Sequence, residues 1–579
     1  MKTNIKAGVA FGAALALVGG NAAFGATMTE TGPSTQTSPY VVPVADGIST
    51  TSVLTVGDTI NGYPMVGVPD GLGAYDNGDG TFTVLMNHEI KPDQGAQHAH
   101  GAAGAFVSKW IVRNDLTVLS GEDLITRVMD YDFATGSWTE ITTAFNRFCS
   151  SDLGPAGSFY DSATGTGTKE LLYLTGEEAG AEGRGTATVA TGPEAGTAYI
   201  LPWMGKMSFE NMLVHPNTGK QTIVTLTDDS GGGEVYVYVG EKRDSGNEVE
   251  RAGLVGGKLY GVKIEGVLDE TDATSIGSDV PFSLVEVPGA EAMTGAQLEE
   301  VSGQLGITSF ARPEDGSWDP SNANGFYFTT TGSFEGISRL WHLMFTDVVG
   351  NVLAGGTATV PVESPAYDPA LPSQEQKGPR MLDNMTVNAN GVVYLQEDPG
   401  KQEYISGIWR LKNGTLEKVA QHDPARFSAP STDAKADTAG SADAHLTIDE
   451  ESSGIIPLPF LGEGKYLLDV QAHYPLDQTL VQGGQLLVMD VEDEKTSQPT
   501  ATSTTTENPT QSATAAPTAS QSTAPTTSSS ATPAPTSTNG ANTLASSGSN
   551  TPMTAAFIGA GLIALGGVAY FVARMRRQA

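Results

Sequence analysis

Short runs of β-branched and aromatic residues recur between residues 27 and 495, each bounded by Gly, Asn or Asp, and no long helical pattern interrupts them. The runs predict strands at Phe82–Met86, Glu170–Leu174, Thr222–Leu226, Glu234–Val239, Gly325–Thr329, Gly391–Leu395, Lys465–Val470 and Gln485–Val488. Hairpin-type turn sequences precede several of them, such as Asn77-Gly78-Asp79-Gly80. Many short strands with regular turns indicate an all-β sandwich, barrel or propeller. The size of this region, without an obvious break, favours a β-propeller with long loop insertions.

Four of the predicted strands run out into acidic residues. The strand ends read Asn87-His88-Glu89, Glu177-Glu178, Asp228-Asp229 and Glu397-Asp398. If these are the innermost strands of a propeller, their ends converge near one mouth of the central channel. Carboxylates gathered there repel one another unless cations lie between them, and Ca²⁺ takes six to eight oxygen ligands. The pattern therefore predicts a cation site, whereas each acidic pair alone is usual at a solvated loop start.

The two ends of the chain predict export and anchoring. Lys2 and Lys6 precede an apolar run and then small residues, so residues 1–25 are expected to be a signal peptide. Near the other end, residues 553–573 are uncharged and long enough for a transmembrane helix. The basic residues of segment 574–579 would then stay in the cytoplasm as a short tail.

Between the working region and the predicted helix lies a segment of low complexity. Residues 496–550 consist almost only of Ser, Thr, Ala, Pro, Gln and Asn, a composition that predicts a disordered stalk. Residues 544–548, Leu-Ala-Ser-Ser-Gly, resemble the sorting signal of sortase-anchored wall proteins. We therefore expect residues 27–495 to be held outside the cell by sortase-mediated attachment to the cell wall or, alternatively, on the outer face of the cytoplasmic membrane.

Charge and cysteine content narrow the function classes further. The chain has 31 Lys and Arg against 66 Asp and Glu, a formal net charge of −35. This acidity argues against nucleic acid as a partner, because binding to a phosphate backbone requires basic residues. The single cysteine, Cys149, rules out an internal disulfide framework. An exported lone thiol is either a thiolate metal ligand or a buried, inert side chain, and the residue alone does not decide between them.

An ordered series of short motifs resembles one known family. From Asn87 to His473 the chain carries, in order, Asn-His-Glu, a Cys after Arg-Phe, a double Glu, Glu-Asn before His-Pro, Asp-Asp, Arg-Pro-Glu-Asp, Leu-Asp-Asn and Glu-Asp-Pro. The series is similar to the PhoX-type alkaline phosphatases. The resemblance implies a six-bladed β-propeller that carries Fe³⁺ and Ca²⁺ at one end of its channel. It also implies hydrolysis of small phosphate monoesters by attack of a metal-bridging oxygen.

The resemblance also implies roles for individual residues. Cys149 corresponds to the thiolate ligand of iron. The carboxylates nearest the metals correspond to Glu178 or its neighbour Glu177, Glu210 and Glu314, and the calcium positions to Asp228, Glu397 and either Asp383 or Glu451. Arg312, two residues from Glu314 on an extended segment, shares its face and can grip phosphate oxygens bidentately. Lys206 is a second candidate for that contact. Hard cations also make physical sense here, since without them an acidic protein repels a phosphate dianion.

The sequence thus favours an exported, monomeric phosphomonoesterase that touches the membrane only through its C-terminal helix. A calcium-stabilised surface propeller that binds a host or wall ligand is an alternative, as is a propeller lactonase or phosphodiesterase. Two other catalytic patterns are disfavoured. Ser162 follows Asp161 as in serine-nucleophile phosphatases, but Gly and Thr around it predict a hairpin loop. A zinc site of His88, His98 and His100 lacks the usual helical spacing of histidine ligands.

Overall fold

A computed structural model describes residues 28–273, 276–428 and 445–495, all of them in the first of two compact units, Met1–Thr500. The second unit, Ala501–Ala579, falls outside the described residues. The predicted signal peptide, stalk, sorting signal, transmembrane helix and basic tail also lie outside them. Among the helices that are described, none is long and apolar enough to cross a membrane.

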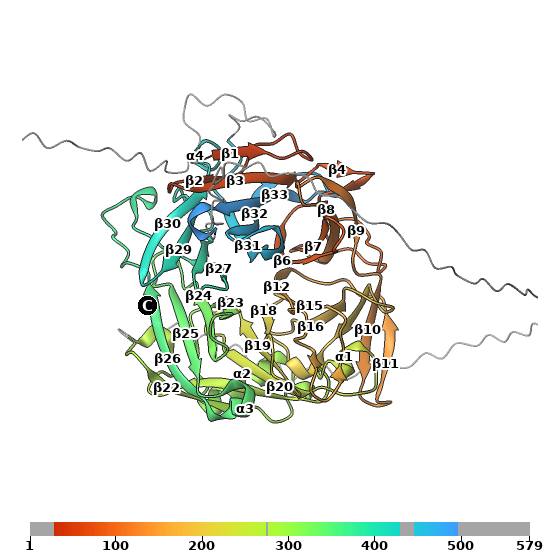
Figure 1. Cartoon of the computed structure of the whole chain (residues 1–579). Coiled ribbons are helices and arrows are strands. Elements are labelled where there is room, and N and C mark those ends of the chain that lie inside the picture. Colours follow the sequence, from red (N-terminus) through yellow and green to blue (C-terminus); the bar gives the residue numbers. More distant parts are fainter. Residues whose placement is uncertain (1–27, 274–275, 429–444, 496–579) are drawn as a thin grey trace, which may run out of the picture. The chain divides into compact units, whose positions relative to one another are not determined.

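The described part is mainly β-structure, in sheets set around a centre (Figure 1). The first sheet has the order β6 (Pro69–Asp76), β7 (Thr81–His88), β8 (Phe106–Arg113), β9 (Val118–Asp123). The second has the order β12 (Phe148–Leu153), β15 (Leu172–Glu177), β16 (Gly185–Val189), β17 (Thr197–Ile200), β10 (Arg127–Asp132), β11 (Ser137–Ile141). A nine-stranded sheet follows, with the order β18 (Phe209–Val214), β19 (Gln221–Asp228), β20 (Val235–Glu241), β21 (Lys258–Ile264), β22 (Val280–Glu286), β26 (Gly356–Glu363), β25 (Arg339–Phe345), β24 (Gly325–Thr330), β23 (Pro313–Trp318).

The last two large sheets combine strands from both ends of this region. One has the order β27 (Leu382–Val387), β28 (Val393–Glu397), β29 (Gly407–Lys412), β30 (Thr415–His422), β2 (Val41–Pro43). The other has the order β31 (Glu450–Pro457), β32 (Lys465–Pro475), β33 (Gln482–Val491), β3 (Ile48–Thr55), β1 (Met28–Thr31). Because β2 and β3 complete sheets built from later residues, ordinary strand pairing joins the two ends of the described region.

The remaining elements are small. Two ribbons pair β4 (Thr59–Ile60) with β5 (Tyr63–Pro64) and β13 (Tyr160–Asp161) with β14 (Thr166–Gly167). The α-helices are α1 (Glu248–Arg251), α2 (Gly295–Leu305), α3 (Val348–Asn351) and α4 (Pro424–Phe427). Short 3₁₀ turns lie at Pro202–Met204, Glu270–Asp272, Ala290–Ala292, Val352–Ala354, Ser373–Glu375, Pro459–Leu461 and Glu492–Glu494.

A closed ring of edge strands forms the inside of this arrangement. Each edge strand contacts the next in the order β6, β12, β18, β23, β27, β31, and β31 contacts β6 again. The nine-stranded sheet supplies β18 and β23 from its two edges, because β22 and β26 pair at its middle. Sheets that radiate from a ring of inner strands form a propeller-like, all-β fold.

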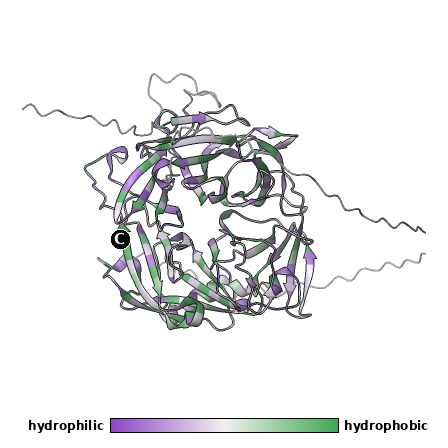
Figure 2. Ribbon diagram, in the orientation of Figure 1, coloured by the Kyte–Doolittle hydropathy of each residue, from purple (hydrophilic) through white to green (hydrophobic). Residues whose placement is uncertain are grey.

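The hydrophobic core lies between neighbouring sheets. One buried cluster packs Leu85 of the first sheet against Tyr173 of the second, and another packs Leu340 of the nine-stranded sheet against Leu395 of the next. Three further clusters join the other pairs of neighbouring sheets, and a fourth packs the two halves of the nine-stranded sheet against each other. Figure 2 shows hydrophobic residues in sheets all around the centre, as expected when each sheet packs apolar side chains against both neighbours. The core therefore needs no disulfide.

The predicted strands exist, but the acidic ones are not innermost. The runs that end in acidic residues belong to β7, β15, β19 and β28, the second strands of their sheets. The second strands run antiparallel to the innermost ones, so the end of each lies beside the start of its neighbour. Glu177 thus pairs with Phe148, Asp228 with Phe209 and Glu397 with Leu382. The ends of the second strands and the starts of the innermost strands therefore lie together at one mouth of the ring.

Candidate metal centre

A register irregularity marks the start of every innermost strand. In β6 it falls directly after Asp70. In the other five the shift spans two residues, and the first residues of these pairs are Cys149, Glu210, Glu314, Asp383 and Ser453. A bulge bends a strand and redirects the extra side chain. Five of the six redirected positions carry a carboxylate or the only thiol of the protein.

The residues that follow the second strands are held beside these bulges by backbone hydrogen bonds. The amide N–H groups of Glu89, Glu178, Asp229 and Asp398 donate to the carbonyl oxygens of Val68, Arg147, Ser208 and Met381, at 2.9, 2.8, 2.8 and 2.9 Å. The residue after each of these strands is therefore held beside the entry to an innermost strand.

Four innermost strands are entered through a left-handed residue that is not glycine. Val68, Arg147, Arg312 and Met381 have φ values of 53°, 48°, 61° and 46°. Each stands two positions before a carboxylate or thiol of the inner ring, namely Asp70, Cys149, Glu314 and Asp383. Such backbone strain persists only where the surrounding structure enforces it, and it concentrates at functional sites.

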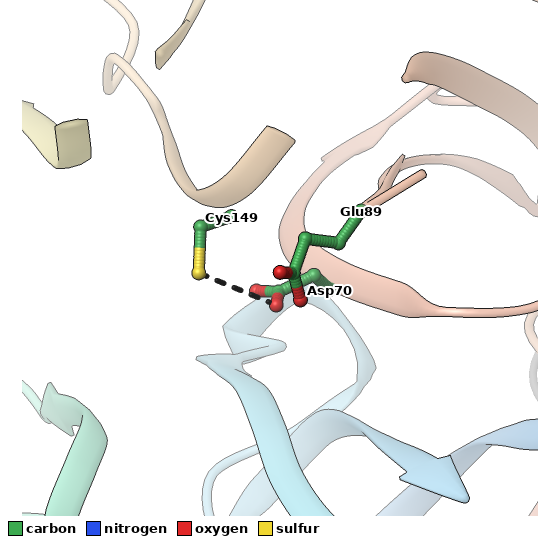
Figure 3. Close-up of side chains that lie close together, drawn as sticks. All are labelled: Asp70, Glu89 and Cys149. Atoms are coloured by element: carbon green, nitrogen blue, oxygen red, sulfur yellow. Dashed lines mark hydrogen bonds between the residues drawn. The ribbon is translucent and has the colours of Figure 1, made fainter. Parts of the chain in front are cut away.

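Seven side chains form one continuous group, which we call the acidic cluster: Asp70, Glu89, Cys149, Glu178, Glu210, Glu314 and Asp383. Three overlapping sets make it up, each with one potential ligand atom per residue and these atoms within 4.8 Å of one another. The sets are Asp70–Glu89–Cys149, Cys149–Glu178–Glu210 and Glu210–Glu314–Asp383. In Figure 3 the carboxylates of Asp70 and Glu89 lie together, and Cys149 Sγ is 3.6 Å from Asp70 Oδ2.

The burial of so many acidic groups in the acidic cluster favours the binding of cations. Burial raises the pKa of the Cys149 thiol, and the carboxylates of Asp70 and Glu210 raise it further. Burial likewise raises the carboxyl pKa of Glu210 and Glu314 well above the usual range, with neighbouring acids adding to the effect. Glu210 Oε1 is buried and has no hydrogen-bond partner within the described ranges 28–273, 276–428 and 445–495. A metal ion would satisfy that oxygen and reverse the pKa shifts, so the donor set fits metal binding.

Two arginines flank the cluster. Arg147 donates from Nε to Glu89 Oε1 at 2.6 Å and contacts Glu178 with its terminal nitrogen. Arg312 makes a bidentate pair with Asp229, at 2.8 and 2.9 Å, and lies 3.1 Å from Glu314 Oε1. The cluster therefore has a guanidinium group beside each of its carboxylate-rich ends.

The structure brings together five of the predicted metal residues: Cys149, Glu178, Glu210, Glu314 and Asp383. Glu451 lies close by, since it pairs in register with Gln471, whose side chain contacts Asp70 and Glu89. Its carboxylate also accepts a hydrogen bond from Ser453 and lies 3.5 Å from His473 Nε2.

The other predicted residues lie outside the acidic cluster. Glu177 binds Arg184 through both oxygens, and Glu397 accepts from the N–H groups of Arg380 and Gly407 and from the Tyr404 hydroxyl. Asp228 accepts from Ser208 N and belongs to a separate acidic group with Glu234 and Glu299. Lys206 pairs with Glu182 on the surface, at 3.0 Å. Because side chains alternate along a strand, the next residues, Asp229 and Asp398, face the mouth instead of Asp228 and Glu397.

Sequence reasoning left several residues of the site unassigned. Glu89 belongs to the Asn-His-Glu motif and Arg147 to the Arg-Phe-Cys motif, so the sequence could have indicated both as site residues. Asp229 and Asp398 are the second residues of the acidic pairs Asp228-Asp229 and Glu397-Asp398. Asp70 follows none of the predicted strands and belongs to none of the motifs, so no pattern in the sequence indicates it.

The channel continues beyond the cluster as a cavity of about 340 Å³. The residues directly after the six redirected positions line it: Gly71, Ser150, Asn211, Asp315, Asn384 and Gly454. Asn211 Nδ2 donates to Asp315 Oδ1 at 2.6 Å, and Asp315 Oδ2 accepts from Met385 N at 3.0 Å. These bonds tie three neighbouring inner strands together directly below the acidic cluster.

The disfavoured catalytic patterns gain no support. Both ring nitrogens of His88 have partners, Gly67 O and Ser108 Oγ, and no three-ligand metal group in the described ranges includes His88, His98 or His100. Ser162 lies between β13 and β14, in the hairpin loop that the sequence predicts.

Comparison with known proteins agrees with the site. The alkaline phosphatase PhoX family matches residues 193–447, which include Glu210, Arg312, Glu314 and Asp383. Among solved structures, the chain is similar to Pseudomonas fluorescens PhoX in complex with vanadate, a transition state analogue. The two share 13% identity with a TM-score of 0.51, over 82% of this chain and 99% of the other.

Other similarities are looser. An Escherichia coli soluble aldose sugar dehydrogenase in the apo form is 8% identical with a TM-score of 0.32, over 77% of this chain and 99% of the other, which carries no functional argument. No curated protein matches the chain by sequence. The chain is thus similar to the alkaline phosphatase PhoX family over residues 193–447 and shares its fold with a solved PhoX.

Proposed function

We propose that this protein is an exported phosphomonoesterase that releases phosphate from small organic esters at a metal centre held by the acidic cluster. The observation that carries the proposal is the meeting of Cys149 with six carboxylates at one mouth of the ring, beside Arg312. When bound, hard cations supply the positive charge that a phosphate dianion needs and an activated water for its hydrolysis.

We further propose Fe³⁺ and Ca²⁺ as the metals. The sulfur of Cys149 lies with Glu178 and Glu210, a mixed donor set that suits iron better than calcium. Glu210, Glu314 and Asp383 offer only oxygen, the donor that Ca²⁺ prefers. Asp229, Asp398 and Glu451 stand close enough to add oxygens at the edges.

Arg312 is the residue of this chain best placed to bind the substrate phosphate. Its guanidinium is about one third exposed, and it lines an open pocket of about 390 Å³ together with Phe334 and Lys401. Its bidentate grip on Asp229 has the geometry that a phosphate would also accept. Lys206 is less well placed for this role, because its side chain is exposed and forms an ion pair with Glu182.

The rest of the proposal concerns the whole protein. The ring of inner strands and the hydrophobic clusters at sheet junctions support a six-bladed propeller. The sequence supports a signal peptide, a stalk, sortase-mediated attachment to the cell wall and a transmembrane helix, and we propose that the protein acts as a monomer outside the cell.

The proposal is tested with purified protein and a chromogenic phosphate monoester. We expect metal-dependent hydrolysis that is lost on chelation of calcium. In the Cys149→Ala variant we expect iron content and activity to fall together by tenfold or more, because the only sulfur donor is gone. Elemental analysis and initial rates measure both.

Two outcomes would count against this assignment. Full activity and normal iron content in Cys149→Ala would exclude the thiolate as a ligand. Turnover of a phosphodiester or lactone, with none of the monoester, would replace the substrate class.

The adjacent residues Glu177 and Glu178 offer a matched pair of variants. We expect Glu178→Gln to weaken metal binding by tenfold or more, because Glu178 lies in the acidic cluster. Glu177→Gln should keep its metals but lose about 2 kcal/mol of stability, since Arg184 loses its charged partner. Metal content and chemical denaturation of both variants check the prediction, and equal metal loss in both would contradict it.

A further inference from the structure

Gln471 joins the two ends of the ring at the acidic cluster. It lies in β32, is fully buried and pairs in register with Glu451 of β31. Its side-chain Nε2 is 2.7 Å from Asp70 Oδ2 and 2.8 Å from Glu89 Oε2. One neutral amide from the last sheet therefore connects two carboxylates of the first sheet.

The chemistry of an amide suits this position. An –NH₂ group carries two hydrogens, so it can donate one to each carboxylate. Asp70 and Glu89 repel each other when both are charged, because they belong to one set of potential ligand atoms that lie within 4.8 Å of one another. The two hydrogen bonds hold them together without adding charge, at the edge of the set that includes Cys149.

The other end of the amide is its carbonyl oxygen. Gln471 Oε1 is buried, and no residue that the structure describes donates a hydrogen bond to it. An unsatisfied buried carbonyl is uncommon and costs free energy, so a ligand for it is expected. Carbonyl oxygens of Asn and Gln are regular ligands of Ca²⁺. Rotation about the last side-chain bond exchanges the positions of Oε1 and Nε2.

We propose that Gln471 has two alternating roles at the metal centre: its N–H groups hold Asp70 and Glu89 together without a cation, and its carbonyl oxygen becomes a ligand when a calcium ion lies between them. The inference rests on the proposed metal-dependent function. It adds a neutral oxygen donor to a centre whose other donors are anionic.

The test follows the melting temperature of the whole purified protein during titration with calcium, after chelation. Gln471→Met keeps the size but removes both roles, and we expect its apparent calcium affinity to fall by roughly 10- to 100-fold. Gln471→Glu removes the donor but supplies a stronger ligand. It should melt well below the parent protein when free of metal, and calcium should raise its melting temperature more than it raises that of the parent.

Gln485 provides the control. It is equally buried, on the adjacent strand β33, but its oxygen and nitrogen already have partners in Tyr40 N, Ser38 O and Thr55 Oγ1. Gln485→Glu should therefore lower the melting temperature equally with and without calcium. If both Gln471 variants show the calcium response of the parent, the inference is overturned and the proposed function stands. A parent protein with no calcium response at all would overturn both.

Discussion

Replacing Arg312 with alanine is expected to lower kcat/KM for a phosphate monoester by about a thousandfold, in the range found for removing one charged or hydrogen-bonding group from a phosphoryl-transfer site. Arg312 is the guanidinium that lies against the Glu314 end of the acidic cluster and faces an open pocket. The loss should fall on binding and turnover together, because a phosphate gains charge contacts in the ground state and in the transition state.

Metal content separates this role from a structural one. Arg312 neutralises Asp229 and lies 3.1 Å from Glu314, so its removal leaves more negative charge around the centre. Cations should then bind at least as tightly as before, while activity falls. A structural role would reduce metal content and activity together.

The Lys206→Ala variant is the control, because it also removes one positive charge but at a position outside the acidic cluster. Lys206 forms an exposed pair with Glu182, and such pairs contribute little. We expect Lys206→Ala to change kcat/KM less than twofold under the same assay. If Lys206→Ala loses activity while Arg312→Ala retains it, the assignment of the phosphate-binding residue is reversed.

Hydrophobic runs were enough to locate the second strands of the sheets but not the innermost ones. β7 reads as a continuous apolar strand and packs on both faces. In contrast β12, Phe-Cys-Ser-Ser-Asp-Leu, and β23, Pro-Glu-Asp-Gly-Ser-Trp, carry polar residues because they line a polar channel. Strands of this composition lack the alternation of apolar and polar residues by which a strand is predicted from sequence.

The sequence does not decide between adjacent acidic residues, for a related reason. A shift of one residue moves a strand side chain to the opposite face, and strand ends cannot be located that closely from sequence. Asp228 and Glu397 were therefore preferred, although Asp229 and Asp398 occupy the mouth. Glu210, Glu314 and Asp383 lie together in the acidic cluster because their motifs include the bulge residue itself, and the Asn or Asp that follows each one lines the channel.

The same bulges explain why strain and chemistry coincide. A left-handed residue lies two positions before the acidic-cluster residue at the start of several innermost strands, and it turns the chain into the strand. The bulge that follows directs the side chain toward the centre of the ring. Repetition of this device in several sheets brings together residues more than 300 positions apart. Bound metal would supply the free energy that maintains such an arrangement, and its removal should therefore be costly.

Removal of metal is expected to make stability fall steeply as pH rises. Burial raises the pKa of Asp398, beside the acidic cluster, to about 8 in the folded protein, and it raises the pKa of Glu210 and Glu314 in the cluster as well. In the unfolded chain these groups titrate near pH 4. A carboxyl with a raised folded pKa favours folding while it is protonated, so this contribution is lost between about pH 4 and pH 8. One pKa unit corresponds to about 1.4 kcal/mol, so several groups together should lower the melting temperature of the chelated protein by on the order of 10 °C between pH 5 and pH 9.

Bound cations should reverse this behaviour. Metal binding replaces protons on the ligands, so the metal-loaded protein should keep its melting temperature over the same interval and release protons when metal is added at pH 7. General repulsion from the net charge of −35 affects both forms, and the difference between their melting curves removes it. Thermal melts at pH 5, 7 and 9 with chelator and with saturating calcium and iron measure that difference. A chelated protein that gains stability from pH 5 to pH 9 would show that the carboxylates of the cluster are stabilised as anions by the protein alone, and the need for metal would disappear with it.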